Sequence, residues 1–202
     1  MVELIPSQET VMQMLTRTGA FREGHFVYPN KKHSPHYFQM PLAFRYYDTA
    51  RVLAVALSRK FRIEKDISSQ LPKVAVISPS SGGIPVAFGV RDALNAEQIY
   101  WAEQEQGERM FRQYVNQGEV SPCIIVDDII RSGNAIVETA RLVKSLGARI
   151  IGCGAIVRFD SALSEVEGVP IKSLVDFDVR MYESGEDCVE CKEGASPEQV
   201  RY

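Results

Sequence analysis

Hydrophobic positions recur with two different periods along the chain, and the change from one period to the other marks the predicted elements. Short apolar runs without polar alternation are typical of strands buried on both faces of a parallel sheet. Runs of this kind occupy residues 74–77, 123–126, 149–157 and 171–177. Apolar residues spaced three or four apart instead predict amphipathic helices, at 46–60, 84–94 and 136–146. Strands that alternate with helices in this way favour an α/β fold with a central, mostly parallel sheet flanked by helices.

The segment before this α/β pattern has a different character. Ser7 predicts the N-cap of a first helix, which Gly19 ends. Residues 19–39 are aromatic and strand-like, and Pro29 and Pro35 are expected to break them. The predicted organisation is one domain over 1–202, made of an N-terminal segment at 1–45, an α/β core at 46–180 and a polar tail at 181–202.

Two adjacent acids follow the central apolar run. Asp127 and Asp128 come directly after Val126, and a short polar turn around Gly133 then leads into the helix at 136–146. Ligands of open α/β sheets bind beyond the carboxyl ends of the strands, where we expect these acids to lie. The free backbone N–H groups and the dipole of a helix N-terminus favour a phosphate. The combination suits a phosphorylated sugar, although an Asp-Asp pair can also simply end a strand.

A second loop with suitable chemistry follows the strand at 74–77. Residues 78–85 contain Gly82 and Gly83, which lack side chains and let the backbone approach a ligand closely. A Gly-Gly turn alone is a weak signal. Two strand–loop–helix units, each with a loop suited to phosphate, make the prediction of a phosphate-binding site stronger.

Composition limits the classes of function. The 202 residues, 45% hydrophobic and 24% charged, suit one ordinary globular domain. A net charge of −3 gives no basic field for nucleic acid. No apolar run approaches the roughly 20 residues that a membrane span needs. Because residues 1–6 lack the regions of a signal peptide, we expect a cytoplasmic protein without a membrane or nucleic-acid partner.

The four cysteines fall into two kinds. Cys123 and Cys153 lie in apolar segments and are expected to behave as small buried hydrophobic residues. Cys188 and Cys191 form a single C-x-x-C near the polar tail. Zinc normally takes four ligands, so a metal site here would need a second chain or distant histidines. Otherwise this pair is two reduced thiols.

Two stretches resemble a known family. The sequence CIIVDDIIRSGNA, residues 123–135, resembles the 5-phosphoribosyl 1-pyrophosphate (PRPP) motif of the type I phosphoribosyltransferases, in which apolar residues lead to two acids and a small polar loop with a central glycine. It departs from the commoner loop at Arg131, Asn134 and Ala135. The sequence HSPHYF, residues 33–38, resembles the N-terminal hood motif of the orotate phosphoribosyltransferases in this family.

The resemblance implies a type I phosphoribosyltransferase fold with a small N-terminal hood. The implied reaction converts orotate and PRPP into orotidine 5′-monophosphate and pyrophosphate, in pyrimidine (UMP) biosynthesis. It also implies Mg²⁺ as cofactor, held by PRPP, and a homodimer. Two other functions stay open: a phosphoribosyltransferase for another base, because Asn30-Lys31 replaces the usual Ser-Gly pair, and a non-catalytic PRPP-binding regulator.

The same resemblance implies a set of site residues. PRPP is expected to contact Ser81, Gly82, Gly83, Asp127, Asp128, Ile129, Ile130, Arg131, Ser132, Gly133, Asn134 and Ala135. Base contacts are expected from Tyr37, Phe38, Arg131 and Arg158. Asp127 and Asp128 are expected to be catalytic and to meet the ribose hydroxyls, directly or through water on Mg²⁺. Arg158 is expected to meet the carboxylate of the base. Arg109 is the expected catalytic cation of a mobile lid at 103–109, although this segment can also be a plain solvated hairpin and Arg158 a solvated strand end.

Overall fold

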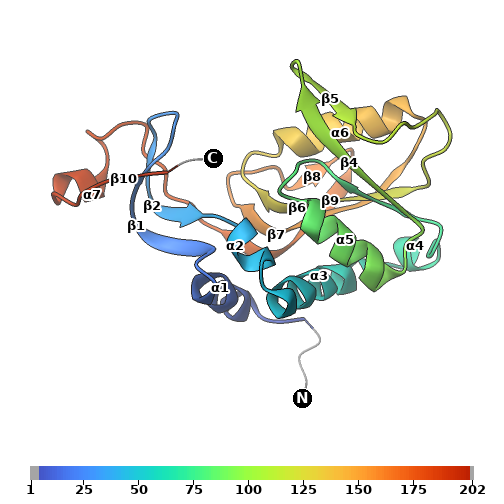
Figure 1. Cartoon of the computed structure of the whole chain (residues 1–202), viewed down its shortest axis with the longest axis horizontal. Coiled ribbons are helices and arrows are strands. Elements are labelled where there is room, and N and C mark those ends of the chain that lie inside the picture. Colours follow the sequence, from blue (N-terminus) through green and yellow to red (C-terminus); the bar gives the residue numbers. More distant parts are fainter. Residues whose placement is uncertain (1–4, 201–202) are drawn as a thin grey trace.

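Seven strands form the central sheet of the computed structural model, which describes residues 5–200 (Figure 1). They are β3 (Ala75–Ser78), β4 (Gln98–Glu105), β5 (Glu108–Phe111), β6 (Cys123–Ile130), β7 (Ile150–Phe159), β8 (Glu165–Val166) and β9 (Val169–Phe177). Their order is β5-β4-β3-β6-β7-β9-β8. The five inner strands run parallel and the two edge strands antiparallel, which confirms the predicted mostly parallel sheet.

Helices cover both faces of this sheet (Figure 1). The helices are α1 (Gln8–Arg17), α2 (Pro41–Phe44), α3 (Tyr47–Arg62), α4 (Lys65–Ser68), α5 (Ile84–Leu94), α6 (Asn134–Ser145) and α7 (Val189–Lys192). The crossover β3–α5–β4 runs toward one edge of the sheet and β6–α6–β7 toward the other. Because such crossovers are right-handed, α5 and α6 lie on opposite faces. The chain therefore changes direction between β3 and β6, which is where open α/β sheets bind ligands.

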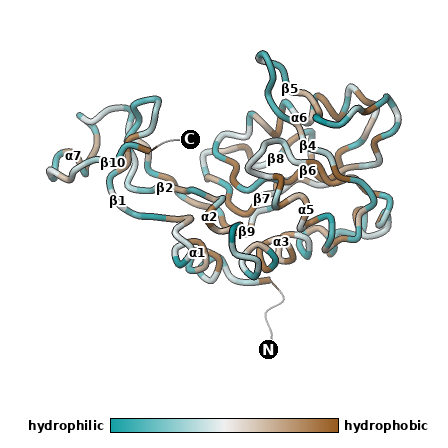
Figure 2. The backbone as a smooth tube through the Cα atoms, in the orientation of Figure 1, coloured by the Kyte–Doolittle hydropathy of each residue, from teal (hydrophilic) through white to brown (hydrophobic). Residues whose placement is uncertain are grey.

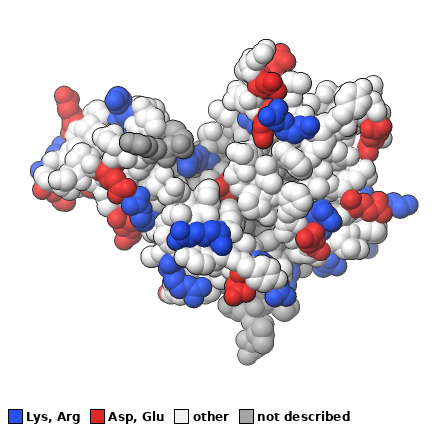
Figure 3. All heavy atoms as spheres, viewed as in Figure 1, with Lys and Arg blue, Asp and Glu red and all other residues white. Residues whose placement is uncertain are grey.

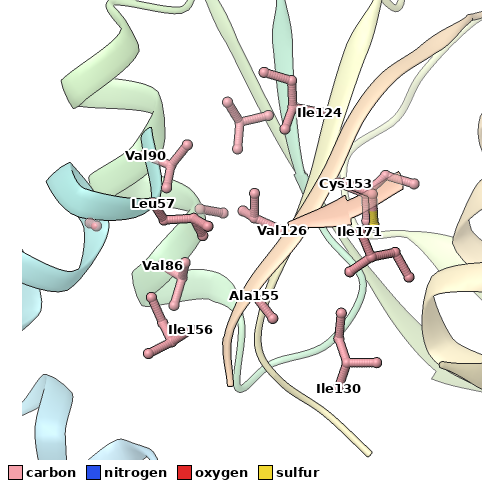
Figure 4. Packing of buried hydrophobic residues seen from close by; sticks show 14 of the residues in the cluster. Leu57, Val86, Val90, Ile124, Val126, Ile130, Cys153, Ala155, Ile156 and Ile171 are labelled. Atoms are coloured by element: carbon pink, nitrogen blue, oxygen red, sulfur yellow. The ribbon is translucent and has the colours of Figure 1, made fainter. Parts of the chain in front are cut away.

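The core lies between the sheet and its helices. Figure 4 shows Leu57 of α3 and Val86 of α5 directed toward Val126 of β6. All three side chains are at most 1% exposed, and burying a side chain of this size stabilises the fold by about 1.5–3 kcal/mol. Cys123 and Cys153 are buried here as predicted, and burial raises the pKa of the Cys123 thiol to about 12. Figure 2 shows hydrophobic residues along the inner strands and hydrophilic residues at the tip of the β4–β5 hairpin.

A second, smaller sheet forms the hood. It contains β1 (Phe21–Val27), β2 (His33–Phe38) and β10 (Glu198–Gln199), in the order β10-β1-β2. The prediction that Pro35 breaks this region was wrong, because Pro35 lies inside β2. A proline lacks the N–H that a central strand needs, but β2 is an edge strand and tolerates it. The strand β10, which the sequence did not predict, pairs parallel with β1 and so joins the C-terminal tail to the hood.

The helices agree closely with the hydrophobic pattern. The side chain of Ser7 accepts a hydrogen bond from the backbone N–H of Thr10 at 3.2 Å, as predicted for an N-cap, and α1 ends just before Gly19. The predicted connector between α3 and β3 contains the additional short helix α4. No helix within residues 5–200 has the length and apolar character to cross a membrane. Residues 1–4, on which part of the signal-peptide prediction rests, lie outside the described part of the chain.

Candidate active site

The two acids lie inside β6 and not at its end, so the predicted end of the strand was wrong. Pairing of β6 with β3 stops at Ile125, whereas pairing with β7 continues to Ile130. Beyond Ile125, one edge of β6 is therefore free of β3, and the loop that follows β3 packs against it. Asp127 and Asp128 lie along this part of β6, which extends past the carboxyl end of β3.

A cavity of about 420 Å³ opens at this place. Its lining comes from the loop after β3 and from the continuous stretch between the acids and the start of α6. The lining residues are Ser80, Gly82, Asp127, Asp128, Ile129, Ile130, Arg131, Ser132, Gly133, Asn134, Ala135 and Ile136. The structure thus brings the predicted PRPP set together around one cavity, except that Ser81 and Gly83 do not line it. Figure 3 shows the surface hollowed between the hood and the main body.

Asp127 is the more enclosed of the two acids. Its Oδ1 accepts hydrogen bonds from the Ser80 hydroxyl at 2.7 Å and from the backbone N–H of Asp128 at 3.0 Å. Burial, and then the neighbouring charge of Asp128, raise the pKa of Asp127 well above its usual range. The Ser80 hydroxyl oxygen also accepts from the backbone N–H of Gly83 at 3.2 Å. Asp127 therefore holds the loop after β3 in place through Ser80.

The sequence did not point to Ser80. It is the first serine in the pair Ser80-Ser81, and only the second was predicted to contact PRPP. Ser81 is exposed, whereas Ser80 faces the acids. A two-serine turn gives no indication of which hydroxyl points inward, because this depends on the backbone path that the glycines allow.

Asp128 lies closer to the phosphate-suited loop. Its Oδ1 accepts from the backbone N–H of Ile129 at 2.9 Å. Burial raises the pKa of Asp128, while Arg131 opposes that rise because a nearby cation favours the carboxylate. Asp128 is 7% exposed and lines the cavity. Two buried carboxylates side by side are costly without a cation, so this pair suits a partner that supplies positive charge or hydrogen-bond donors.

The two glycines are required by how closely the loop approaches the acids. A Cβ on Gly83 would lie 2.4 Å from Asp127 Oδ1 and 2.6 Å from Ser78 Oγ. A Cβ on Gly82 would lie 2.9 Å from Asp128 Oδ2. Any side chain at these two positions would push the loop away from β6 and break the hydrogen bonds of the Ser80 hydroxyl. The predicted importance of Gly82-Gly83 thus has a steric cause.

The turn 131–135 carries the chain from β6 into α6. Gly133 has φ +94° and precedes the first residue of α6, a backbone conformation that other residues rarely adopt. The first turn of α6 lies on the cavity wall. Helix N-terminal N–H groups have no partner within the helix and bear a partial positive charge. The cavity thus has carboxylates on one side and helix amides on the other.

Arg109 reaches this region from the β4–β5 hairpin. Residues 103–105 extend β4 and 108–111 form β5, so the segment predicted as an irregular mobile loop is largely a paired hairpin. The Arg109 guanidinium donates to the carbonyl oxygen of Pro79, in the loop after β3. Its Nε also bonds Glu138 Oε2 of α6 at 2.9 Å. With its side chain 11% exposed, Arg109 links the hairpin to both walls of the cavity.

The predicted base contacts are not brought into the cavity lining, with the exception of Arg131. Tyr37 and Phe38 are 6% and 3% exposed, and the Phe38 ring packs against aromatic residues of the core, including Phe177 at a centroid distance of 4.9 Å. The Arg131 Nη2 lies 3.5 Å from the Phe38 carbonyl oxygen, which connects β2 to the cavity. Arg158 lies next to Ile130 on the adjacent strand β7.

Arg158 does not line the cavity and forms an ion pair with an acid on β9. Its Nη2 and Nε lie 2.8 and 2.9 Å from Asp176 Oδ1. The side chain is 16% exposed, so it is more enclosed than a solvated strand end. A carboxylate ligand that bound Arg158 would have to share the guanidinium with Asp176 or displace it.

Comparison with known proteins agrees with this geometry. The family model described as "Phosphoribosyl transferase domain" matches residues 48–180. The fold and the site thus define a protein of the phosphoribosyltransferase class.

More specific relatives share almost the whole chain. An orotate phosphoribosyltransferase of Thermoanaerobacter sp. (strain X514) is 32% identical over 93% of this chain and 93% of the relative. Another, from Thermotoga petrophila, is 30% identical over 94% of this chain and 96% of the relative. The crystal structure of orotate phosphoribosyltransferase from Aeropyrum pernix superposes with a TM-score of 0.67 at 21% identity, over 83% of this chain and 93% of that one, and shows the shared fold. The chain belongs to the orotate phosphoribosyltransferase family.

Proposed function

We propose that the chain transfers the phosphoribosyl group of PRPP to orotate, giving orotidine 5′-monophosphate and pyrophosphate on the route to UMP. The observation that carries the proposal is the cavity at the change of direction between β3 and β6, where Asp127 and Asp128 face the N-terminus of α6. The similarity to orotate phosphoribosyltransferases supports orotate as the base, and the geometry of the cavity supports binding of a sugar phosphate.

The reaction exchanges two bonds at the anomeric carbon of the ribose. The bond to pyrophosphate breaks and its electron pair leaves with the pyrophosphate oxygen. A ring nitrogen of orotate, already deprotonated because it is acidic, supplies the pair for the new C–N bond. Positive charge develops on the ribose ring between these events, as in glycoside transfer. The Asp128 carboxylate stabilises that charge and accepts hydrogen bonds from the ribose hydroxyls.

The two loops divide the phosphate groups between them. The backbone N–H groups of the turn 131–135 and of the first turn of α6 bind the 5′-phosphate. The loop 80–83 binds the departing pyrophosphate through its backbone. Asp127 acts as a positioning residue, since its bond to the Ser80 hydroxyl fixes that loop.

The residues present fit a magnesium cofactor. Mg²⁺ takes hard oxygen ligands and keeps several waters, and the two carboxylates that line the cavity are donors of this kind. Asp127 and Asp128 would hold it through water, together with the phosphate oxygens of the substrate. When bound, Mg²⁺ neutralises the charge of the leaving pyrophosphate.

The hairpin supplies the cation of the lid. Arg109 exchanges its bond to the Pro79 carbonyl for the pyrophosphate and helps to exclude water, which would otherwise compete with orotate. Arg131 and Arg158 meet the carboxylate of the base, with Tyr37 and Phe38 forming the wall behind them. The family resemblance also implies that the chain acts as a homodimer in the cytoplasm. Size-exclusion chromatography with light scattering tests the dimer.

One assay distinguishes this function from its alternatives. The purified chain is mixed with PRPP, Mg²⁺ and one base at a time, from orotate, uracil, adenine, guanine and hypoxanthine, and the ultraviolet absorbance of the base is followed. Consumption of orotate alone is the expected result. Consumption of another base in preference to orotate supports a phosphoribosyltransferase for that base, the alternative that Asn30-Lys31 left open. PRPP binding without turnover of any base supports a regulator.

A further inference from the structure

Four potential metal ligands meet where the C-terminal tail packs against the hood. They are His25 of β1, His33 of β2, and Cys188 and Cys191 of the tail. One ligand atom from each residue lies within 4.8 Å of the other three. In the stretch of chain that the structure describes, no other group of His, Cys, Asp and Glu side chains converges in this way.

Three of the distances between ligand atoms are those expected around a tetrahedral ion. His25 Nε2 lies 3.6 Å from Cys188 Sγ and 3.4 Å from Cys191 Sγ, and His33 Nδ1 lies 3.4 Å from Cys191 Sγ. Ligands at the usual zinc bond lengths, arranged as a tetrahedron, lie about 3.3–3.8 Å apart. The two ring nitrogens, 3.0 Å apart, need to separate by only a few tenths of an ångström. We propose that His25, His33, Cys188 and Cys191 bind one structural Zn²⁺ ion.

The surroundings hold the ligands in the required orientation. The other ring nitrogen of His25, Nδ1, lies 2.8 Å from the carbonyl oxygen of Ala195. A proton on Nδ1 leaves Nε2 free as a metal ligand, which is the arrangement typical of zinc-bound histidines. Cys188 is 0% exposed and His25 6%, so the site is closed to solvent on that side. A Cβ on Gly185 would lie 3.4 Å from Cys191 Sγ, so a glycine leaves room beside the cluster.

The donor set points to zinc in particular. Two thiolates and two imidazoles in a tetrahedron are a common structural zinc site, whereas magnesium and calcium prefer oxygen. The carboxylate of Glu190, 3.1 Å from Cys188 Sγ, accepts a hydrogen bond from the protonated thiol. Binding of the ion releases that thiol proton, and Glu190 then turns toward solvent.

The hood has a structural need for such an ion. Within residues 5–200, the hydrophobic cluster of the hood that is separate from the main core consists of Phe26, Tyr28, Tyr37 and Val200. Units with so small a core commonly depend on a metal or a disulfide for stability. The proposed ion joins β1 and β2 to the tail, beside the pairing of β10 with β1 (Figure 1). The proposal of this ion does not rest on the proposed transfer reaction.

The test is the metal content of the full chain, purified without chelators from cells grown with zinc. Plasma mass spectrometry for zinc, iron, nickel and copper should find about one zinc per chain and little of the other metals. Replacement by Co²⁺ should give the visible absorption bands of a tetrahedral cobalt–thiolate site. Cys191→Ser and His33→Asn should lose the zinc and the cobalt bands.

Matched variants control for general damage to the fold. His36→Asn changes another histidine of β2, and Cys153→Ala changes a buried cysteine of the core, and both should keep one zinc per chain. Three results would overturn the proposal: zinc far below one per chain in the wild type, zinc retained by both ligand variants, or a Cys188–Cys191 disulfide in protein purified under reducing conditions. Because the readout is metal content, failure here leaves the proposed transfer reaction untouched, and loss of activity alone does not decide it.

Discussion

The cavity beside β6 and the cluster in the hood both bring reactive side chains together, but from very different distances along the chain. The cavity takes its lining from Ser80 and Gly82 and from the stretch 127–136. In the hood cluster, Cys188 meets His25 from 163 positions away. The first site lies on strands of the main hydrophobic core, and the second joins strands whose separate hydrophobic cluster is small.

Polar residues have a different role in each of these two sites. At β6, burying two carboxylates without a ligand lowers the stability of the fold. The many apolar contacts of the surrounding core offset this cost. In the hood, the polar residues themselves supply the stability that a small core lacks. We therefore expect changes beside β6 to affect catalysis first, and changes in the hood cluster to affect local stability first.

The largest expected effect is on catalysis at Asp128. Asp128→Asn removes the charge that stabilises the cationic ribose, so kcat should fall by about 10²–10³-fold. The free energy of unfolding and the zinc content should stay as in the wild type. Steady-state kinetics with orotate and denaturant unfolding measure the two quantities, and Asp66→Asn, an exposed acid of α4, serves as the control. A near-normal kcat would remove this carboxylate from the mechanism.

A second strong effect is expected at Gly83. Its Cβ would collide with Asp127 Oδ1 at 2.4 Å, so Gly83→Ala should displace the loop and lower the free energy of unfolding by about 1–3 kcal/mol. The KM for PRPP should rise because the pyrophosphate loop moves. Pro85→Ala, exposed in the first turn of α5, is the neighbouring control. An unchanged KM together with unchanged stability would show that the loop does not depend on close contact with β6.

An intermediate effect concerns recognition of the base. Arg158→Ala should raise the KM for orotate about tenfold or more, since losing a charge-assisted hydrogen bond costs about 1.5–3 kcal/mol. The KM for PRPP should change much less. Arg131→Ala, which alters the cavity wall itself, should raise both constants. Equal effects of Arg158→Ala on both substrates would argue against its contact with the carboxylate.

A local effect is expected when the hood loses its metal. Treatment with a zinc chelator should increase amide hydrogen exchange in β1, β2 and β10, while exchange in β6 and β7 stays slow. The hydrophobic cluster of the hood is small, whereas the central sheet lies in the main core, so we expect the hood to respond more to loss of the ion. Exchange that rises equally in both sheets would show that the two regions unfold together.

The smallest effect is a pH dependence of stability at Asp127. Burial raises the pKa of Asp127 above its unfolded value of 3.8, so the fold favours the protonated acid. The contribution of this raised pKa to the free energy of unfolding is fully present below pH 3.8 and is lost as the pH rises through the folded-state pKa. Asp127→Asn cannot lose a proton, so its stability relative to the wild type should increase as the pH rises above 3.8. Parallel pH profiles in denaturant unfolding would contradict this.

The sequence was most informative where structure and chemistry are local. The apolar runs and helical periodicity predicted β3, β6, β7, β9, α3, α5 and α6, because strands buried on both faces leave a clear hydrophobic signal. The PRPP-like stretch is continuous, so its residues 127–135 all line one cavity. The exact end of β6 was missed, because β6 extends past β3 and its acids lie within the strand.

Features set by tertiary contacts were harder to predict. The two-residue strand β10 has no periodicity and exists only because it pairs with β1. The inward direction of Ser80 depends on the path of the glycine loop. The C-x-x-C left a metal site open if distant histidines approached, and only the fold places His25 and His33 beside it.

The most direct test of the account is a crystal structure of the chain with PRPP and Mg²⁺. The account predicts the 5′-phosphate within hydrogen-bonding distance of the backbone N–H groups of residues 132–136, and the ribose hydroxyls next to Asp128. PRPP bound anywhere else, or a ribose turned away from both aspartates, would contradict it.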